Sequence, residues 1–174
     1  MTKPPIRHST VAVVLARGGS KGVPFKNLVS VGNRPLIEHT LERARSADLI
    51  SRVIVSTDNR EIARVSENLG AEIIWRPAEL CADTSSSESG LVHCLDRLKE
   101  GDGKEPERVV FLQATSPLRS AGHIEEALTM FEMEGADSLF SAGPLQGLAW
   151  RIDGGRVVPV SYDPQRRKRR QDAS

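Results

Sequence analysis

Aromatic residues and cysteines are scarce in this sequence of 174 residues, and it contains no long apolar run. The aromatic fraction of 4% leaves few side chains on which bases could stack, so we expect no nucleic-acid partner. The two cysteines, Cys81 and Cys94, are too few and too far apart for a zinc site, and we expect reduced thiols. Residues 1–10 lack the apolar centre of a signal peptide, and no apolar run reaches about 18 residues. The sequence therefore predicts no membrane partner and a cytoplasmic location.

An excess of charge of one sign is also absent overall, because the net charge is only +1. The distribution is nevertheless uneven. Residues 165–174 contain five basic side chains and Asp172, a balance of +4, which leaves −3 for the rest of the chain. This pattern argues against a general polyanion-binding surface and indicates one basic segment with its own task.

A glycine-rich, cationic loop near the start of the chain is the most informative stretch. It follows a valine-rich apolar run at 11–16 that is typical of a strand buried on both faces. Free backbone N–H groups and fixed cations in one loop indicate a site for a phosphate-rich ligand. A solvated, flexible turn is the alternative, since the loop matches neither a Walker A nor a dinucleotide-binding pattern. The residues concerned are Arg17, Gly18, Gly19, Ser20, Lys21, Gly22 and Lys26.

Strand-like and helix-like segments alternate along the following residues. Short apolar runs are succeeded by stretches whose apolar residues recur every three or four positions. This alternation predicts an α/β fold, a three-layer, Rossmann-like, mostly parallel sheet with helices on both faces. We expect strands at 11–16, 52–56, 71–75, 108–112 and 138–142, and helices opening at 34–35 and covering 60–69, 85–98 and 124–131.

Polar residues at two element ends are candidates for the site or for helix capping. Asp58 follows the strand at 52–56, where it is either the N-cap of the next helix or a ligand contact at the carboxyl edge of the sheet. Residues 85–87 are three serines before a helix, for which they supply capping oxygens.

Beyond Gly143 the pattern changes. Residues 148–160 predict a β-hairpin with its turn at Gly154 and Gly155, which projects from the sheet. We therefore divide the chain into an α/β domain at 1–143, which contains the glycine-rich loop, and a hairpin with a basic arm at 144–174.

Five segments together resemble the CMP-sialic acid synthetases, also called acylneuraminate cytidylyltransferases. They occur in the family's order from residue 11 to about residue 172, and their residues look like those of the branch that includes animal enzymes. Two positions depart from the pattern, because Leu15 and Ala114 stand where many members have proline. The segments are 17–27, Ser56-Thr57-Asp58, Arg76-Pro77 with 83–86, Gln113 with 115–119, and Arg169-Arg170-Gln171-Asp172.

The resemblance implies a reaction of CTP with N-acylneuraminate (sialic acid) that gives CMP-sialate and pyrophosphate. The anomeric hydroxyl would attack the α-phosphorus in line, which requires positioning and charge neutralisation but no covalent nucleophile. Lys26 and Arg17 would be catalytic, with Lys26 stabilising charge at the α-phosphate. Alternatives are the same chemistry on legionaminate, pseudaminate or another keto-acid sugar, and a truncated, non-catalytic nucleotide-binding module.

The resemblance also assigns binding residues. Arg17, Gly19, Ser20 and Lys21 would bind the triphosphate, Asn27 the ribose side, and Arg76 with Ser85 and Ser87 the cytosine. Gln113, Thr115 and Ser116 would face the acceptor sugar. The hairpin would be the dimerisation arm of a homodimer, in which Arg169 or Arg170 pairs with the sugar carboxylate in the neighbouring subunit.

Two expectations concern the end of the chain. The basic tail is alternatively a solvated, disordered end or a nuclear-import or nucleic-acid patch, and a nuclear location fits an animal-like member. Family members continue beyond the Gln171-Asp172 segment to an Asp-x-Asp pair that binds Mg²⁺. The resemblance thus implies Mg²⁺ as cofactor, with its ligands in this chain unknown, and a truncated chain of low or absent activity.

Overall fold

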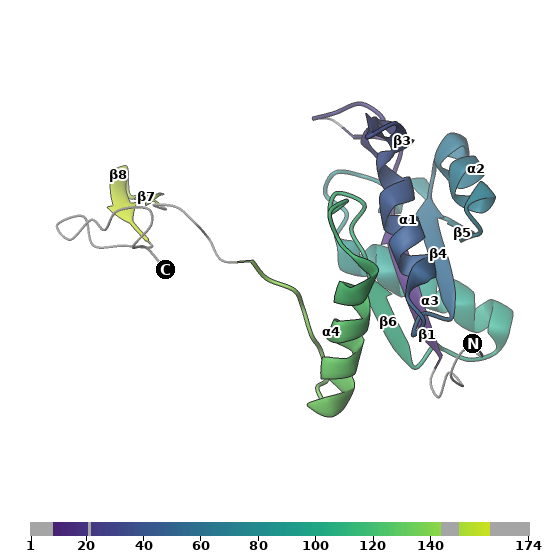
Figure 1. The fold of residues 1–174 in the computed structure, drawn as a ribbon. Helices are drawn as coiled ribbons and strands as arrows, with labels where there is room; N and C mark the ends of the chain where they lie inside the picture. The colour runs from purple at the N-terminus through teal and green to yellow at the C-terminus, as the bar shows by residue number, and fades with distance from the viewer. Residues whose placement is uncertain (1–8, 21, 144–149, 161–174) are drawn as a thin grey trace. The chain divides into compact units, whose positions relative to one another are not determined.

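The computed structural model describes residues 9–20, 22–143 and 150–160, which belong to two units. The first unit ends at Asp137 and contains a sheet flanked by helices, and the second begins at Ser138 and contains a small hairpin (Figure 1). Among these residues, no helix combines the length and the apolar character that crossing a bilayer requires. Each unit is described separately below.

A parallel, four-stranded sheet forms the centre of the first unit. Its strands are β1 (Thr10–Leu15), β4 (Arg52–Thr57), β5 (Glu72–Trp75) and β6 (Arg108–Phe111), in the order β5-β4-β1-β6. Strand β1 is central, and Val13 is aligned with Ile54 of β4 and with Phe111 of β6. The strand order reverses between β1 and β6. In open α/β sheets, such a reversal leaves a ligand-binding crevice beyond the carboxyl ends of the two strands.

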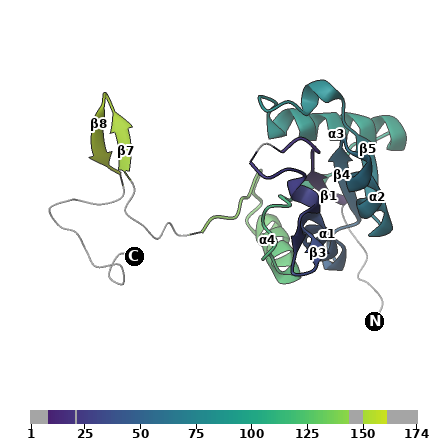
Figure 2. The ribbon, with the colours of Figure 1, turned by 90° about the horizontal axis from the view of Figure 1, so that it is seen from above.

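Helices cover both faces of this sheet, with α1 and α4 on the face opposite α3 (Figure 2). Ala12 and Val14 belong to a core cluster to which α1, α2 and α4 contribute. Val11 and Val13 alternate with them and belong to a second cluster, formed with α3. This confirms the predicted three-layer fold and the reading of 11–16 as a strand buried on both sides. The helices are α1 (Leu36–Ser46), α2 (Arg60–Asn68), α3 (Ser87–Asp102) and α4 (Ala121–Met133).

One predicted strand does not form, and the first helix begins later than predicted. The expected strand at 138–142 is wrong, since these residues pair with no described strand and Phe140 is 86% exposed. A short apolar run is weakly specified as a strand until a neighbouring strand and a packed face are available. The first helix begins after Arg34–Pro35, because these two residues form β3. Strand β3 pairs with β2 (Ser30–Val31) across a turn whose two central residues have positive φ, Gly32 at 57° and Asn33 at 66°.

The second unit contains the predicted hairpin. Strands β7 (Trp150–Asp153) and β8 (Arg156–Pro159) are antiparallel, and Trp150 is aligned with Pro159. The turn residues Gly154 and Gly155 have φ of 54° and 77°, which glycine adopts without strain. Residues 161–174, with the basic tail, lie outside the described residues.

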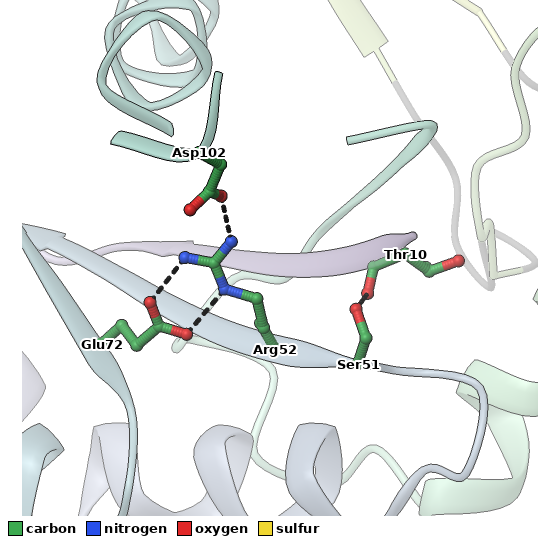
Figure 3. Close-up of polar contacts among 5 residues, drawn as sticks. All are labelled: Thr10, Ser51, Arg52, Glu72 and Asp102. Atoms are coloured by element: carbon green, nitrogen blue, oxygen red, sulfur yellow. Dashed lines mark hydrogen bonds and ion pairs between the residues drawn. The ribbon is translucent and has the colours of Figure 1, made fainter. Parts of the chain in front are cut away.

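Arg52 connects three elements at the end of the sheet opposite the carboxyl edge (Figure 3). Its Nε and one terminal nitrogen donate to the carboxylate of Glu72 at 2.8 and 2.7 Å, and its other terminal nitrogen donates to Asp102. The hydrogen bond to Glu72 raises the pKa of Arg52, so the guanidinium stays charged. Nearby, the Ser51 hydroxyl donates to the carbonyl of Thr10 at 2.6 Å and links the start of β4 to β1.

Replacing Arg52 by methionine is expected to lower the free energy of unfolding by about 0.5–1.5 kcal/mol, because a bidentate, half-buried ion pair is lost. Urea denaturation measures the change. Arg64→Met is the control, since it removes an exposed pair with Glu61 within α2, for which about 0.5 kcal/mol or less is expected. Equal losses for the two variants would contradict the role given to Arg52.

Candidate functional site

A pocket of about 460 Å³ lies at the carboxyl ends of β1 and β6. Its wall includes Leu15 at the end of β1, Phe111 at the end of β6 and the first residue of α3, Ser87. The pocket therefore occupies the crevice that the reversal of strand order creates. A 16-residue helix, α3, begins at the wall with Ser87, and the dipole at a helix N-terminus favours an anionic ligand.

The pocket unites residues that the sequence analysis took from widely separated segments. Those that line it are Arg17, Ser20, Lys26, Asn27, Ser87, Gln113 and Thr115. Gly19, Arg76, Ser85 and Ser116 do not line it, and Lys21, Arg169 and Arg170 lie outside the described residues. Gly22 of the predicted glycine-rich loop also lines it. The wall is completed by Leu15, Val23, Phe111 and Ala114, apolar or small residues that no polar pattern marks as part of a site. The individual roles remain predictions.

The loop between β1 and β2 is closed by its own hydrogen bonds. The Asn27 side-chain amide donates to the carbonyl of Arg17 at 3.1 Å and is buried, with 6% of the residue exposed. Asn27 is the middle residue of a single 3₁₀ turn, Lys26–Leu28, which is preceded by Phe25 at a φ of 49°. Non-glycine residues adopt this left-handed conformation at a cost, which the surrounding loop must compensate. The turn brings Lys26 to the pocket wall on a defined backbone.

Asp58 anchors the glycine-rich loop to the end of β4. Its carboxylate accepts a hydrogen bond from the backbone N–H of Gly18 at 2.8 Å. Of the two alternatives for Asp58, helix capping is wrong, because the Asn59 side chain accepts from N–H groups in the first turn of α2, those of Glu61 and Ile62. The two adjacent residues thus divide the tasks, Asn59 starting the helix and Asp58 binding the loop.

Arg17 extends to a third segment of the chain. One terminal nitrogen donates to the carbonyl of Cys81 at 3.0 Å, and the other donates to the carboxylate of Asp83 at 2.7 Å.

The pKa of the Cys81 thiol is raised, chiefly by burial and further by the nearby Asp58, whereas the charge of Arg76 lowers it in part. A thiol with a raised pKa stays protonated and unreactive.

Arg76 and the serines before α3 have structural contacts. Arg76 is only 9% exposed, and it donates to the carbonyl of Ser56 at 2.9 Å, while its Nε has no partner among the described residues. The Ser85 hydroxyl donates to the carbonyl of Glu79 at 2.8 Å. Ser86 is the N-cap of α3, which confirms that this serine run supplies a capping oxygen.

The described residues do not supply a metal site. No group of three or more histidine, cysteine, aspartate or glutamate side chains in this part of the chain is arranged to bind a metal ion. Of the described residues that line the pocket, Arg17 and Lys26 are cations and none is acidic. The arrangement suits an anion with several oxygens, which can accept from both cations and from backbone N–H groups.

A family model described as Cytidylyltransferase matches residues 11–152. The chain is 36% identical to N-acylneuraminate cytidylyltransferase A of Danio rerio over 174 residues, covering 97% of this chain and 39% of the relative. It is 34% identical to N-acylneuraminate cytidylyltransferase of Escherichia coli O18:K1:H7, covering 73% of this chain and 29% of the relative. The chain thus spans about two fifths or less of these relatives.

Two solved structures share the fold. One is CMP:2-keto-3-deoxy-manno-octonic acid synthetase complexed with CTP, with a TM-score of 0.60, 24% identity, and coverage of 74% of this chain and 49% of that chain. The other is 4-diphosphocytidyl-2C-methyl-D-erythritol synthase, with a TM-score of 0.64, 15% identity, and coverage of 88% and 68%. At these identities the likeness supports the architecture alone.

Gly18→Ala is expected to lower the free energy of unfolding by about 1–3 kcal/mol, as overpacking does. An added Cβ would lie 2.8 and 2.9 Å from Nδ2 and Cβ of Asn59, the residue that caps α2. Gly19→Ala is the matched control, because a Cβ there meets nothing within 4 Å, and we expect a change within about 0.5 kcal/mol. Denaturation of both variants tests the close approach, and indistinguishable stabilities would refute it.

Proposed function

The chain belongs to the cytidylyltransferase family, and on this premise we propose that it binds CTP and transfers CMP to N-acylneuraminate, releasing pyrophosphate. The observation that supports this proposal best is the pocket at the β1–β6 reversal, whose wall combines Arg17, Lys26 and the N-terminus of α3. The choice of acceptor rests on the names of the relatives, which are N-acylneuraminate cytidylyltransferases of fish and bacteria.

In the proposed reaction, the anomeric hydroxyl of the sugar attacks the α-phosphorus of CTP. A bond forms between that oxygen and phosphorus, the hydroxyl proton passes to solvent water, and the bond to the bridging oxygen breaks, so that its electron pair leaves with pyrophosphate. Negative charge grows on the α-phosphate and on the leaving group, and fixed cations stabilise it without reorganisation. Lys26 is suited to the α-phosphate, and Arg17 with Ser20 to the departing phosphates, because all three line the pocket.

Selection of cytosine and of the sugar uses other parts of the wall. The exocyclic amine of cytosine requires an acceptor where uracil requires a donor, and a backbone carbonyl of the 85–87 segment would meet that demand. Gln113 and Thr115 line the pocket, which supports the proposal that they contact the acceptor. Arg76 and Ser85 do not line the pocket and would have to reach the base from outside its wall, so their part in base recognition remains a prediction.

The remaining parts of the proposal concern assembly, cofactor and location. We propose a homodimer in which the β7–β8 hairpin and Arg169 or Arg170 contribute to the partner's sugar site. Mg²⁺ is proposed with the triphosphate, although the described residues contain no ligand set for it, so no step here depends on it. A cytoplasmic location agrees with two free cysteines, Cys81 and Cys94.

Calorimetry with CTP, UTP and GTP tests the nucleotide. We expect CTP to bind at least about tenfold more tightly than UTP, since a buried polar group left unpaired costs of the order of 1–3 kcal/mol. Product analysis with the protein in excess over CTP and N-acylneuraminate tests the reaction, because even slow turnover then yields CMP-sialate. Equal affinity for CTP and UTP, or no CMP-sugar from any keto-acid acceptor, would refute the proposal.

Lys26→Met is expected to reduce the rate of CMP-sialate formation by about 100- to 1000-fold, as loss of one preorganised charge-stabilising group does. CTP affinity should fall much less, because other residues of the wall, Arg17 and Ser20 among them, would still contact the triphosphate. Lys104→Met is the control, since Lys104 is exposed in the turn after α3 and does not line the pocket. A rate for Lys26→Met within a few fold of the unmodified chain would remove Lys26 from the mechanism.

A further inference from the structure

Arg17 is fixed by acceptors that are not part of the pocket wall. Arg17 lines the pocket, whereas Cys81 and Asp83, to whose carbonyl and carboxylate its guanidinium donates, do not. Two different terminal nitrogens make the two bonds, at 3.0 and 2.7 Å. A guanidinium has more N–H groups than these bonds use, so it retains donors for a ligand.

The acceptors lie on a segment with its own internal hydrogen bonds. The 3₁₀ turn Ala78–Leu80 is followed by the Cys81 N–H donating to the carbonyl of Ala78 at 3.0 Å. Farther along, the Ser85 N–H donates to the carbonyl of Ala82 at 3.1 Å, and the Ser85 hydroxyl donates to Glu79. Asp83 is therefore part of a tied loop, and Arg17 is bound to a comparatively rigid partner.

An unrestrained arginine side chain loses rotamer freedom when it binds an anion, which weakens binding. An arginine already fixed by a charge-assisted bond has lost that freedom before the ligand arrives. Solvent does not fully screen the ion pair that fixes Arg17, because the Arg17 and Asp83 side chains are only 31% and 38% exposed. The carboxylate also adds a negative charge near the pocket, which by itself disfavours a polyanion.

We propose that Asp83 is a positioning residue of the triphosphate site. It orients Arg17 toward the phosphates, and the affinity gained in this way outweighs the repulsion between the Asp83 carboxylate and the phosphates. This inference rests on the proposed function, because it takes the ligand of Arg17 to be the triphosphate. It also gives a role to one residue of segment 83–86, for which the sequence analysis had assigned only Ser85. The opposing possibility, that Asp83 competes with phosphate for Arg17, predicts the reverse effect on affinity.

The test measures the dissociation constants of CTP and of inorganic pyrophosphate for Asp83→Ala and Asp83→Asn, each with and without Arg17→Met. Asp83→Ala is expected to weaken both ligands by about two- to fivefold, the range for a partly exposed ion pair. Asp83→Asn should bind at least as tightly as the unmodified chain, because its amide oxygen still accepts from Arg17 and its charge is gone. With Arg17→Met present, Asp83→Ala should no longer weaken binding, and both ligands should bind as tightly or somewhat more tightly, because only the repulsion by the carboxylate is removed.

Glu105→Ala is the matched control, since it removes one negative charge and an exposed ion pair, the 2.8 Å contact with Lys99, away from the pocket. It should leave both affinities unchanged. Thermal unfolding verifies that the variants fold. If Asp83→Ala does not fold, Asp83→Ser replaces it in the same measurements.

Unchanged or tighter binding by Asp83→Ala would overturn the inference, as would an equal loss in the Arg17→Met background. If the unmodified chain binds pyrophosphate but not CTP, the proposed function fails, while the pyrophosphate series still decides the role of Asp83. Binding of neither ligand would refute both.

Discussion

The hydrogen bond from the backbone N–H of Gly18 to Asp58 is the contact on which the site depends. It joins the loop after β1 to the end of β4, next to the helix cap Asn59, and only a residue without a Cβ fits that approach. The parallel order of the sheet makes the contact possible, because the carboxyl ends of β1, β4 and β6 share one edge. Removing any of these conditions would leave the cations of the loop without a fixed geometry.

Charge explains what this geometry can bind. Among the described residues, the pocket wall has Arg17 and Lys26 but no acidic side chain, and the N-terminus of α3 reaches the wall at Ser87. The nearby carboxylates, Asp58 and Asp83, bind the loop and do not line the pocket. Cations fixed in this way cost little to arrange around phosphates, which is how a transferase stabilises charge without a covalent nucleophile.

Local patterns allowed much of the fold and part of the site to be predicted. The buried character of 11–16, the serine cap before α3 and the Gly154–Gly155 turn follow from residue type and spacing alone. Contacts between distant segments were not accessible in this way: Arg17 and Asp83 are 66 residues apart, and only the folded sheet edge brings them together. The strand predicted at 138–142 failed for the same reason, because a run becomes a strand only beside a partner.

A crystal structure of the chain with bound CTP tests the central claim most directly. The account predicts triphosphate density at the carboxyl ends of β1 and β6, in contact with Arg17 and Lys26, with Gly18 still bound to Asp58. CTP located elsewhere on the first unit, with this loop free of phosphate, would contradict it.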